Sequence, residues 1–303
     1  MTPRIQLIKS LLITDFPSGS SINYHEGKFY LIGDDSTNIL ILDTDYLKID
    51  SVQLFDYTEK RIPKSDKIDL EGSVILKMDG TDHLLIVGSA SRKHRKRIIL
   101  IPFSNGGLDF KTLQHSLHKT KDFIKRIKAN EIEEINLEGV CLLKNDLVLG
   151  NRGNRASQNN HLIITDHNFW EQQDDAKLLI RKLEMPDGQS EKILGVSELC
   201  YIEEQDPLLI TLTSEATENA YDDGAIGNSY IGWIKNAASR LQSDNAVLDG
   251  MINLAEIDAI FESEKIEGIC VEKVTSNELI LHLVSDNDLG ESRLFKIKML
   301  IQD

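Results

Sequence analysis

The chain has 303 residues, of which 41% are hydrophobic and 27% charged, so it is long enough to bury a sizeable core and has the composition of a globular protein. Its 49 acidic residues outnumber the 34 basic ones, and the net charge of −15 disfavours nucleic acids and anionic membranes as partners. No stretch has the apolar length of a membrane helix and residues 1–15 lack a signal-peptide pattern, so we expect a cytoplasmic protein, or a secreted one whose leader was removed.

The first predicted element is an apolar-rich strand at residues 4–14. Five similar units follow it, and each opens on a related segment before continuing in short strands rich in Leu and β-branched residues. The opening segments are GSSINY at 19–24, DLEGSVI at 69–75, NLEGVCL at 136–142, VSELCYI at 196–202 and KIEGICV at 265–271. Their spacing of roughly 50–70 residues is somewhat above that of a propeller blade, and it indicates five blades.

Each unit is predicted to contain a second and a third strand, and in most units an outer strand is visible. Second strands are predicted at 29–35, 84–91, 147–154, 208–215 and 279–286, third strands at 39–43, 97–103, 161–166, 229–235 and 293–299, and outer strands at 51–55 and 177–185. The last unit ends too early for an outer strand, whereas the N-terminus has one to spare. We therefore predict an all-β, five-bladed β-propeller in which residues 4–14 complete the last blade.

We expect one domain over residues 1–303 with two insertions. Residues 115–134 have the helical spacing of Phe123 and Ile127, and residues 237–261 are long enough to contain a short helix. Cys141, Cys200 and Cys270 lie in apolar runs without metal-ligand spacing, so we interpret them as buried hydrophobic residues.

The repeated motif predicts a ring of polar side chains at the propeller axis. The first strand of each blade lies nearest the axis, so Ser20, Glu71, Glu138, Glu198 and Glu267 are expected to converge there. Their mutual repulsion can be relieved by protonation, by cations placed between them or by a metal ion. No Lys or Arg occupies the motif positions, so basic neighbours are not evident. We predict a Ca²⁺ ion, with Mg²⁺ as second choice.

Two alternatives remain open for this ring. Each Glu can instead hydrogen-bond the next blade and lock the ring, with the neighbouring Gly permitting close backbone approach. In the fourth unit, alignment of Cys200 with Cys141 and Cys270 places Ser197 rather than Glu198 in the Glu position. Three carboxylates would then remain, which is still enough for Ca²⁺.

Residues 20–37, which contain Gly27-Lys28 and Asp34-Asp35, resemble the first blade of the calcium-activated nucleotidases (apyrases), and residues 265–269 resemble the Glu-Gly motif of that family's last blade. The Leu-Glu-Gly repeats are also similar to phytase-like and SdiA-regulated propellers. The resemblance covers the inner strands with only a few residues per blade. It implies five blades, an axial Ca²⁺ held by Ser and Glu, and a bacterial branch of this broad group.

Further polar residues are expected on the face above the ring. Asp34 and Asp35 are candidate catalytic bases, and Arg152 and Arg155 can clamp a phosphate or carboxylate unless they pair with neighbouring acids. The remaining candidates for substrate binding are Arg92, Asn151, Glu215 and Asp286. Basic residues at 92–97, together with Lys119, Lys121, Lys125 and Lys128, can attract an anion or form a solvated hairpin tip.

No nucleophile elbow, phosphate-binding loop or zinc-protease helix is found, so hydrolysis would depend on metal-activated water. We expect a Ca²⁺-dependent hydrolase of phosphoesters or phosphoanhydrides that acts on a small anionic molecule. The alternative is a non-catalytic propeller with a structural Ca²⁺ that binds a ligand or a protein partner. A lactonase-type hydrolase is a third reading, although such enzymes usually have six blades.

Overall fold

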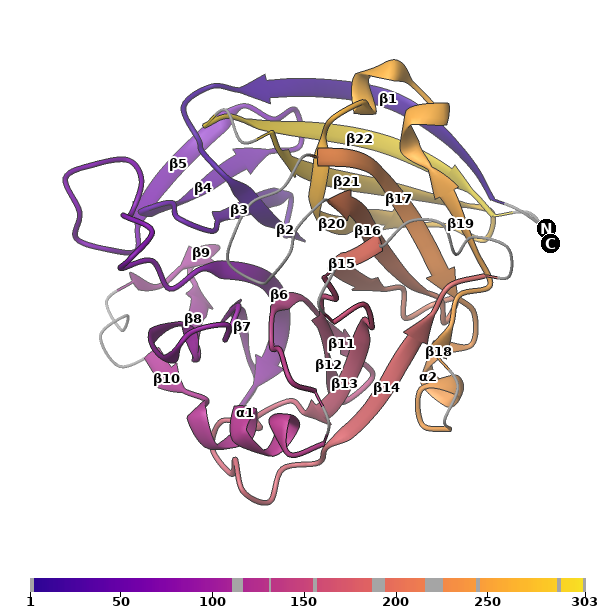
Figure 1. Ribbon diagram of the computed structural model, residues 1–303. Helices are drawn as coiled ribbons and strands as arrows, with labels where there is room; N and C mark the ends of the chain where they lie inside the picture. Colours follow the sequence, from indigo (N-terminus) through magenta and orange to yellow (C-terminus); the bar gives the residue numbers. More distant parts are fainter. Residues whose placement is uncertain are drawn as a thin grey trace.

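The computed structural model describes residues 3–110, 117–130, 132–154, 157–186, 194–215, 226–243, 246–287 and 290–301. Five antiparallel sheets stand around a common axis, and each begins with an inner strand and ends with an outer one (Figure 1). The inner strands contact each other in cyclic order, with the first beside the last. The predicted all-β, five-bladed propeller is therefore confirmed.

The sheets follow the chain, blade by blade. Blade one contains β2 (Gly19–His25), β3 (Lys28–Gly33), β4 (Asn38–Asp43) and β5 (Lys48–Gln53), and blade two contains β6 (Leu70–Met78), β7 (Thr81–Gly88), β8 (Arg97–Ser104) and β10 (Leu117–Lys119), with the short β9 (Gly107–Leu108) on β8. Blade three contains β11 (Leu137–Leu143), β12 (Asp146–Asn151), β13 (His161–Asp166) and β14 (Leu179–Glu184), and blade four contains β15 (Leu194–Tyr201), β16 (Leu208–Glu215), β17 (Ile226–Ile234) and β19 (Gly250–Asn253).

The last blade is completed by the N-terminus, as the sequence predicts. It contains β20 (Lys265–Val274), β21 (Glu278–Asp286) and β22 (Ser292–Leu300), and its outer strand is β1 (Arg4–Ile13). The β1–β22 pairing is antiparallel and runs from Arg4 opposite Leu300 to Ile13 opposite Ser292. The two ends of the chain thus share one sheet, which closes the ring without a free edge between the first and last blades.

Both predicted insertions contain helix. α1 (Lys121–Lys128) buries Phe123, Ile124 and Ile127 in the core between blades two and three. Residues 237–261 contain α2 (Ala237–Arg240) and the 3-10 turns η3 (Leu254–Glu256) and η4 (Ala259–Phe261). They also supply β19 and the short β18 (Ala246–Val247), which pairs in parallel with β14, so this segment is part of two blades as well as a connection.

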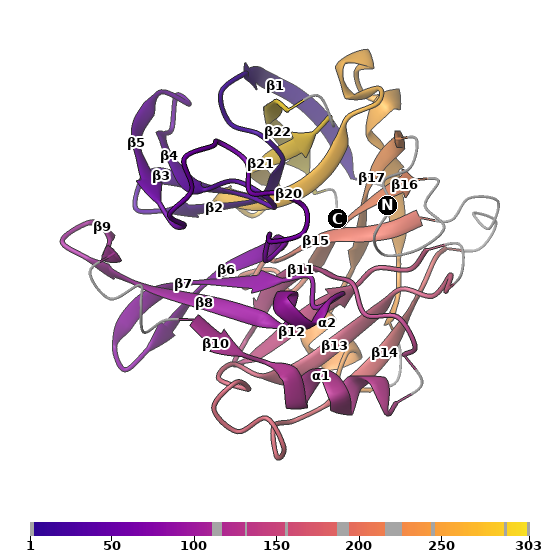
Figure 2. The ribbon, with the colours of Figure 1, turned by 60° about the vertical axis from the view of Figure 1, so that its left-hand side comes forward.

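Apolar side chains fill the spaces between neighbouring blades, and five clusters of buried residues follow one another around the ring. Figure 2 shows the five blades from a second direction. Cys141, Cys200 and Cys270 are buried and unpaired, which confirms the interpretation of these residues as part of the apolar interior. Among the described residues, no helix combines the length and apolar character needed to cross a membrane.

Each inner strand has one extra residue near its start. The register shifts by one residue at Ser20, Glu71, Glu138, Ser197 and Glu267. Each of these is therefore the extra residue of a β-bulge, and it has no partner in the regular pairing with the second strand. The next position is glycine in three strands because the strands approach closely there. A Cβ atom on Gly139 would lie 2.7 Å from the Cα of Glu198, and one on Gly268 would lie 3.0 Å from the Cα of Ser21.

Candidate functional site

The inner strands all run in the same direction along the axis. Their starts, with the bulged residues, therefore gather at one end, which we call the entry end. Asp34 also lies there, because its backbone N–H donates to the carbonyl oxygen of Ser18, just before β2, at 3.0 Å. The bulged residues and the turns after the second strands thus share one end of the axis, as expected from the sequence.

Glu198 occupies the middle of the axis and connects four blades. One carboxylate oxygen accepts the backbone N–H groups of Val140 and Leu199 at 2.7 and 3.0 Å, and the other accepts the hydroxyl of Ser21 at 2.8 Å. The backbone N–H of Ser73 also stabilises the carboxylate. Burial nevertheless raises the pKa of Glu198 well above its usual value. Both oxygens are occupied by protein donors, as in the alternative in which Glu locks the ring.

The register settles which residue of the fourth blade matches the other glutamates. Ser197 forms the bulge, and Glu198 follows it at the position where Gly72, Gly139 and Gly268 stand in other blades. Placing Glu198 in the ring of equivalent side chains is therefore corrected. Its carboxylate extends between the inner strands because its neighbours at that level have little or no side chain.

The predicted ligands do not meet at a single point. Among the described residues, the only group of three or more His, Cys, Asp or Glu side chains whose ligand atoms lie within 4.8 Å of one another is Asp34, Asp69 and Glu71. We call this group the acidic cluster. Of the five predicted metal ligands it contains Glu71 alone. The hydroxyl of Ser20 lies 2.6 Å from the carbonyl oxygen of Leu70 in the next blade.

A lysine pairs with both aspartates of the acidic cluster. The Lys67 ammonium lies 2.5 Å from Asp34 and 2.8 Å from Asp69, and Arg95 in η1 (Lys93–Arg95) pairs with the other oxygen of Asp69. Asp34 Oδ1 is buried and has no hydrogen-bond partner. No hydrogen bond to the Glu71 carboxylate occurs in the part of the chain that the structure describes. Glu71 is therefore a half-buried axial carboxylate without a hydrogen-bond donor among the described residues.

The pKa shifts follow this difference in partners. Burial, and then the carboxylates of Glu138, Asp69 and Asp34, raise the pKa of Glu71 well above its usual value. Burial also raises the pKa of Asp34 to about 6, although Lys67 acts against the shift. Burial favours the neutral form of Asp69 too, but Lys67 and Arg95 outweigh it and lower the pKa of Asp69. The cluster thus combines an ionised Asp69 with two carboxyl groups that readily hold protons.

Two other predicted ligands are neutralised by basic residues. Lys265 lies 2.7 Å from Glu267. Glu138 accepts a hydrogen bond from Asn136 and lies 3.7 Å from Arg152, whose guanidinium also donates to Ser197 at 3.2 Å. The expectation that the ring lacks basic neighbours is wrong. Arg152 directly follows β12, and Lys265 is the first residue of the opening segment KIEGICV itself.

The predicted substrate-binding residues are less free than expected. Arg152 is 7% exposed and lies against the backbone of Gly195, so it links blades three and four rather than forming an open clamp. The Asn151 side chain accepts the backbone N–H of Asn136 at 2.9 Å. Arg92 is exposed and Asp286 half-buried. Arg155 and the side chain of Glu215 lie outside the described residues.

Asp35, the second candidate base, is held by an arginine that the sequence reasoning missed. Arg61 lies 2.7 Å from Asp35 Oδ2, and Asp35 is only 5% exposed. Lys67 and Asp69 were missed as well, although a signal existed. Residues 67–69 read Lys-Ile-Asp, and residues 265–267 read Lys-Ile-Glu at the start of another inner strand. Each Lys stands two positions before the acid with which it pairs, although Lys67 lies four positions before the bulged Glu71 and Lys265 two positions before the bulged Glu267.

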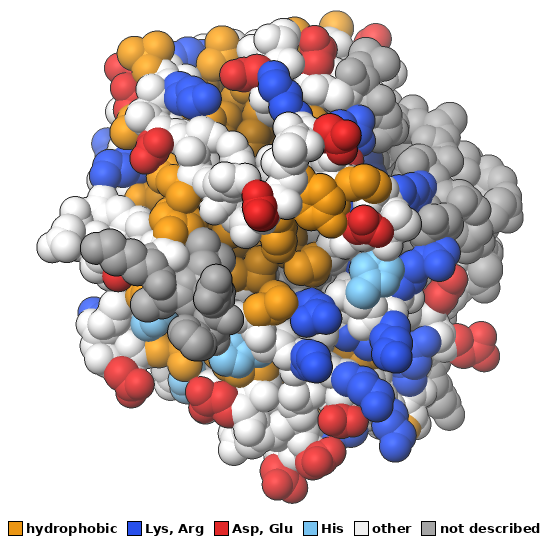
Figure 3. Space-filling view, turned by 90° about the vertical axis from the view of Figure 1, so that its left-hand side faces the viewer, with side chains coloured by type: hydrophobic (Ala, Val, Ile, Leu, Met, Phe, Trp, Pro, Cys, Tyr) orange, Lys and Arg blue, Asp and Glu red, His pale blue; other side chains and the backbone are white. Residues whose placement is uncertain are grey.

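The two basic segments of the sequence come together on the surface. β10 pairs with β8 so that Lys119 lies opposite Arg97. Partial burial, and then the charges of Lys128 and Lys121, lower the pKa of Lys96. Figure 3 shows Lys and Arg side chains gathered in the lower right part of the side that it presents. Because η1 also contributes Arg95 to the acidic cluster, the basic segment that contains it adjoins the entry end.

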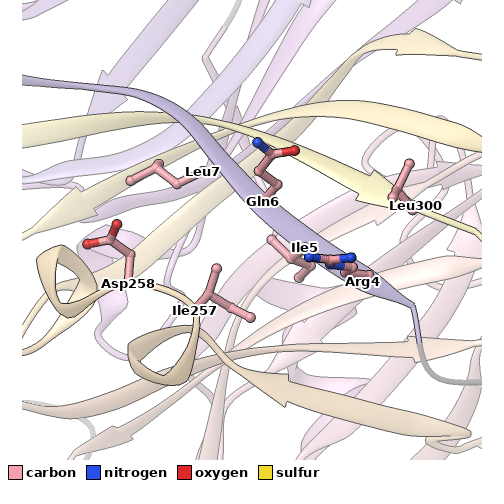
Figure 4. A pocket seen from close by; sticks show the side chains of 7 residues that line it. All are labelled: Arg4, Ile5, Gln6, Leu7, Ile257, Asp258 and Leu300. Carbon is pink, nitrogen blue, oxygen red and sulfur yellow. The ribbon is translucent and has the colours of Figure 1, made fainter.

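A separate hollow of about 400 Å³ lies at the rim of the propeller. It is lined by β1, the end of β22 and the turn between η3 and η4 (Figure 4). Its lining residues are Arg4, Ile5, Gln6, Leu7, Ile257, Asp258 and Leu300. None of the predicted site residues is among them, so the candidate site remains at the entry end of the axis.

Comparisons with known proteins place the chain in a family. A family profile matches residues 15–299. The chain belongs to DUF6929, a family of unknown function. No curated protein matches this DUF6929 chain. Among solved structures, it is similar to the glutaminyl cyclase of Myxococcus xanthus, with a TM-score of 0.55, 12% identity and coverage of 99% of this chain and 98% of the cyclase.

A second similar structure is the tail fiber of Staphylococcus aureus phage P68, with a TM-score of 0.53 and 11% identity. The match covers 99% of the DUF6929 chain and 53% of the tail fiber. At these identities the likeness shows the propeller fold alone. The resemblance to calcium-activated nucleotidases and phytase-like propellers stays a prediction.

Proposed function

We propose that the acidic cluster binds a divalent cation, Ca²⁺ first and Mg²⁺ second, and that the site hydrolyses a phosphoester or phosphoanhydride. The observation that supports this is the approach of Asp34, Asp69 and Glu71 oxygens to within 4.8 Å of one another. Both cations prefer carboxylate oxygens. The cluster fits such an ion because Asp34 Oδ1 is buried without a hydrogen-bond partner, and an unsatisfied buried carboxylate oxygen is costly. The half-buried Glu71 carboxylate beside it has no hydrogen bond among the described residues.

Lys67 competes with any cation for this cluster. Its ammonium already lies within 2.8 Å of both aspartates, so the incoming ion has to displace part of that pairing. Binding also has to remove protons from groups whose pKa is raised, among them Asp34 at about 6. We therefore expect modest affinity that increases as the pH rises from 5 to 8.

A bound divalent cation would polarise the substrate and lower the pKa of a water molecule. The chain's own residues supply the rest. Asp34 Oδ1 is the base that accepts a proton from the attacking water, because it has no other partner and its pKa of about 6 suits neutral conditions. Arg61 is 53% exposed and its charge interacts with Asp34, so it is placed to receive an anionic substrate group.

The second candidate is a non-catalytic propeller that binds a small ligand at the same end. The observation that favours it is the pairing of Glu138, Glu267 and Asp69 with Arg152, Lys265 and Lys67. A charged network that is already neutralised does not require a cation. This candidate predicts ligand binding without turnover and no stabilisation by Ca²⁺ or Mg²⁺.

The experiment measures thermal unfolding and hydrolysis with Ca²⁺, with Mg²⁺ and with a chelator. The substrates are nucleotides, phytate and a generic phosphoester, and a glutaminyl peptide is added because a cyclase of that name shares the fold. Hydrolysis is expected to require the cation, and ion at a hundred times its dissociation constant should stabilise the fold by about 2.7 kcal/mol. Absence of both effects contradicts the proposed hydrolase.

The matched variants are Asp34→Asn and Glu71→Gln in the cluster and Glu59→Gln on the exposed surface of blade one. The cluster variants should lower turnover about 10²-fold or more, while Glu59→Gln leaves it unchanged. Lys67→Met removes the competing ammonium and should tighten cation binding. If Lys67→Met binds cations but the natural protein does not, the non-catalytic candidate is the correct one.

A further inference from the structure

A second cavity lies at the opposite end of the axis. It measures about 230 Å³ and is lined by residues of all five inner strands, with Lys144 and Glu203 from the turns that follow two of them. Each strand contributes the residue three positions after its bulge. These residues are Asn23, Val74, Cys141, Cys200 and Cys270. Three of the five equivalent positions are therefore cysteines, and all three line this cavity.

The order of the strands determines which thiols are neighbours. β15 lies between β11 and β20, so Cys200 stands between Cys141 and Cys270, whereas those two are not adjacent. All three are free and buried, and the backbone N–H groups of Tyr201, Val271 and His282 donate to the sulfur atoms of Cys141, Cys200 and Cys270, in that order. Because Glu198 acts on the pKa of all three thiols, they also lie close to the carboxylate in the middle of the axis.

We propose that this cavity binds one soft monovalent cation of the Cu(I) type between Cys200 and either Cys141 or Cys270. Thiolates select such ions because sulfur and the ion are both soft. A pair of ligands is the natural arrangement, since the three sulfur atoms do not lie within 4.8 Å of one another as a group. Each metal–sulfur bond replaces one S–H bond, and the released proton passes to solvent through the mouth of the cavity.

The surroundings favour a soft ion over a hard one. Burial, and then nearby Cys200 or Glu198, raise the pKa of the thiols, so that of Cys200 is about 12. An ion with weak affinity for sulfur, such as Ca²⁺ or Mg²⁺, cannot displace these protons. The complex with two thiolates carries one negative charge, and the cation at the mouth is Lys144, whose ammonium lies 3.6 Å from a Glu203 carboxylate oxygen. The site shares no residue with the acidic cluster, so a test of Cu(I) binding is independent of the test of the proposed hydrolase.

The test is an anaerobic titration of the fully reduced protein with Cu(I) against a coloured Cu(I) chelator. The natural protein should remove one equivalent of Cu(I) from the chelator. Cys200→Ser should weaken binding about 100-fold or more, because it leaves two thiols on non-adjacent strands. Cys141→Ser and Cys270→Ser each keep one adjacent pair and should stay within about tenfold of the natural affinity.

A restoration variant keeps the proposal testable if Cys200→Ser is poorly folded. Val74 occupies the equivalent position on β6, beside β11, so Val74→Cys in the Cys200→Ser background creates a new adjacent pair with Cys141. It should restore binding of one equivalent, and Val74→Ser in the same background should not. The proposal is overturned if Cys200→Ser binds Cu(I) normally, if each lost cysteine lowers binding equally, or if Val74→Cys restores nothing.

Discussion

Glu198 in the middle of the axis and Glu71 at its entry end are both carboxylates of inner strands, yet the protein treats them differently. Glu198 accepts hydrogen bonds from residues of three other blades and from the backbone of the adjacent Leu199. Among the described residues, it belongs to no group of three or more His, Cys, Asp or Glu side chains that could hold a metal ion. Glu71 has no hydrogen-bond donor in the described structure and stands beside Asp34 and Asp69. Burial raises the pKa of both residues, so burial alone does not distinguish them.

The difference separates a residue that holds the ring together from one that is available for chemistry. A buried polar group whose partners are all supplied by the protein contributes to a unique packed structure. A carboxylate left without partners costs stability, and such a cost is commonly found at functional sites. We therefore expect substitutions at Glu198 and Glu71 to change stability in opposite directions.

The largest effect is expected for Glu198→Ala. This change removes the acceptor for the N–H groups of Val140 and Leu199 and the hydroxyl of Ser21, and it leaves a hole on the axis. Two or three unsatisfied donors together with a cavity should cost about 4 kcal/mol of unfolding free energy. Urea denaturation measures this loss of unfolding free energy. The control is Glu203→Ala, because the Glu203 side chain is 74% exposed.

A loss below about 1 kcal/mol for Glu198→Ala would show that water or rearranged backbone replaces the carboxylate. Glu198 and Glu71 would then no longer represent two kinds of site. A comparable loss for Glu203→Ala would indicate that blade four is generally sensitive to substitution, and the axial carboxylate would then have no specific role in stability.

The propeller could be predicted from the sequence because the same pattern of segments and strands recurs in five units. Five related segments, second and third strands in every unit, and a spare N-terminal strand all agree, and the structure places them in five sheets. The bulge was harder to predict. A slip of one residue exchanges Ser197 and Glu198 between the ring and the axis, and the sequence of the fourth unit is compatible with both registers.

The ion pairs of the site could be predicted only in part. Lys67 and Lys265 each stand two positions before the acid with which they pair, so this local spacing was a signal, although the two lysines are not at equivalent positions of the repeat. Arg95 and Arg61 come from a 3-10 turn and a loop that no repeat relates to their partners. Contacts between non-repeated loops depend on how the blades pack, so a sequence pattern within one strand does not predict them.

A second buried ionisable group is fully partnered, as Glu198 is. His282 is completely buried between Tyr46, whose hydroxyl lies 2.6 Å from Nδ1, and Glu272, which lies 2.8 Å from Nε2 and pairs with Lys296. The network joins blade five to blade one. Burial lowers the pKa of His282 to about 4, although Glu272 acts against the shift.

Because the folded pKa of His282 lies below its unfolded value of 6.5, its neutral form stabilises the fold at pH values above 6.5. That stabilisation, about 3 kcal/mol, should be lost as the pH falls from 6.5 to 4. Unfolding free energies of the natural protein and of His282→Gln, measured across this window, isolate the contribution. Parallel pH profiles for the two proteins would contradict it.

The smallest and most discriminating effect is expected for Glu71→Gln. The raised pKa of Glu71 means that its ionised form is disfavoured in the folded state, so the residue costs stability as the pH rises above its ordinary value of 4.5. The neutral amide removes that cost. The variant should match the natural protein at pH 4.5 and be about 1 kcal/mol more stable at pH 8 by urea denaturation. A variant that is less stable at pH 8 would reveal a partner that holds the Glu71 carboxylate, and Glu71 would then be, like Glu198, a residue that holds the inner strands together.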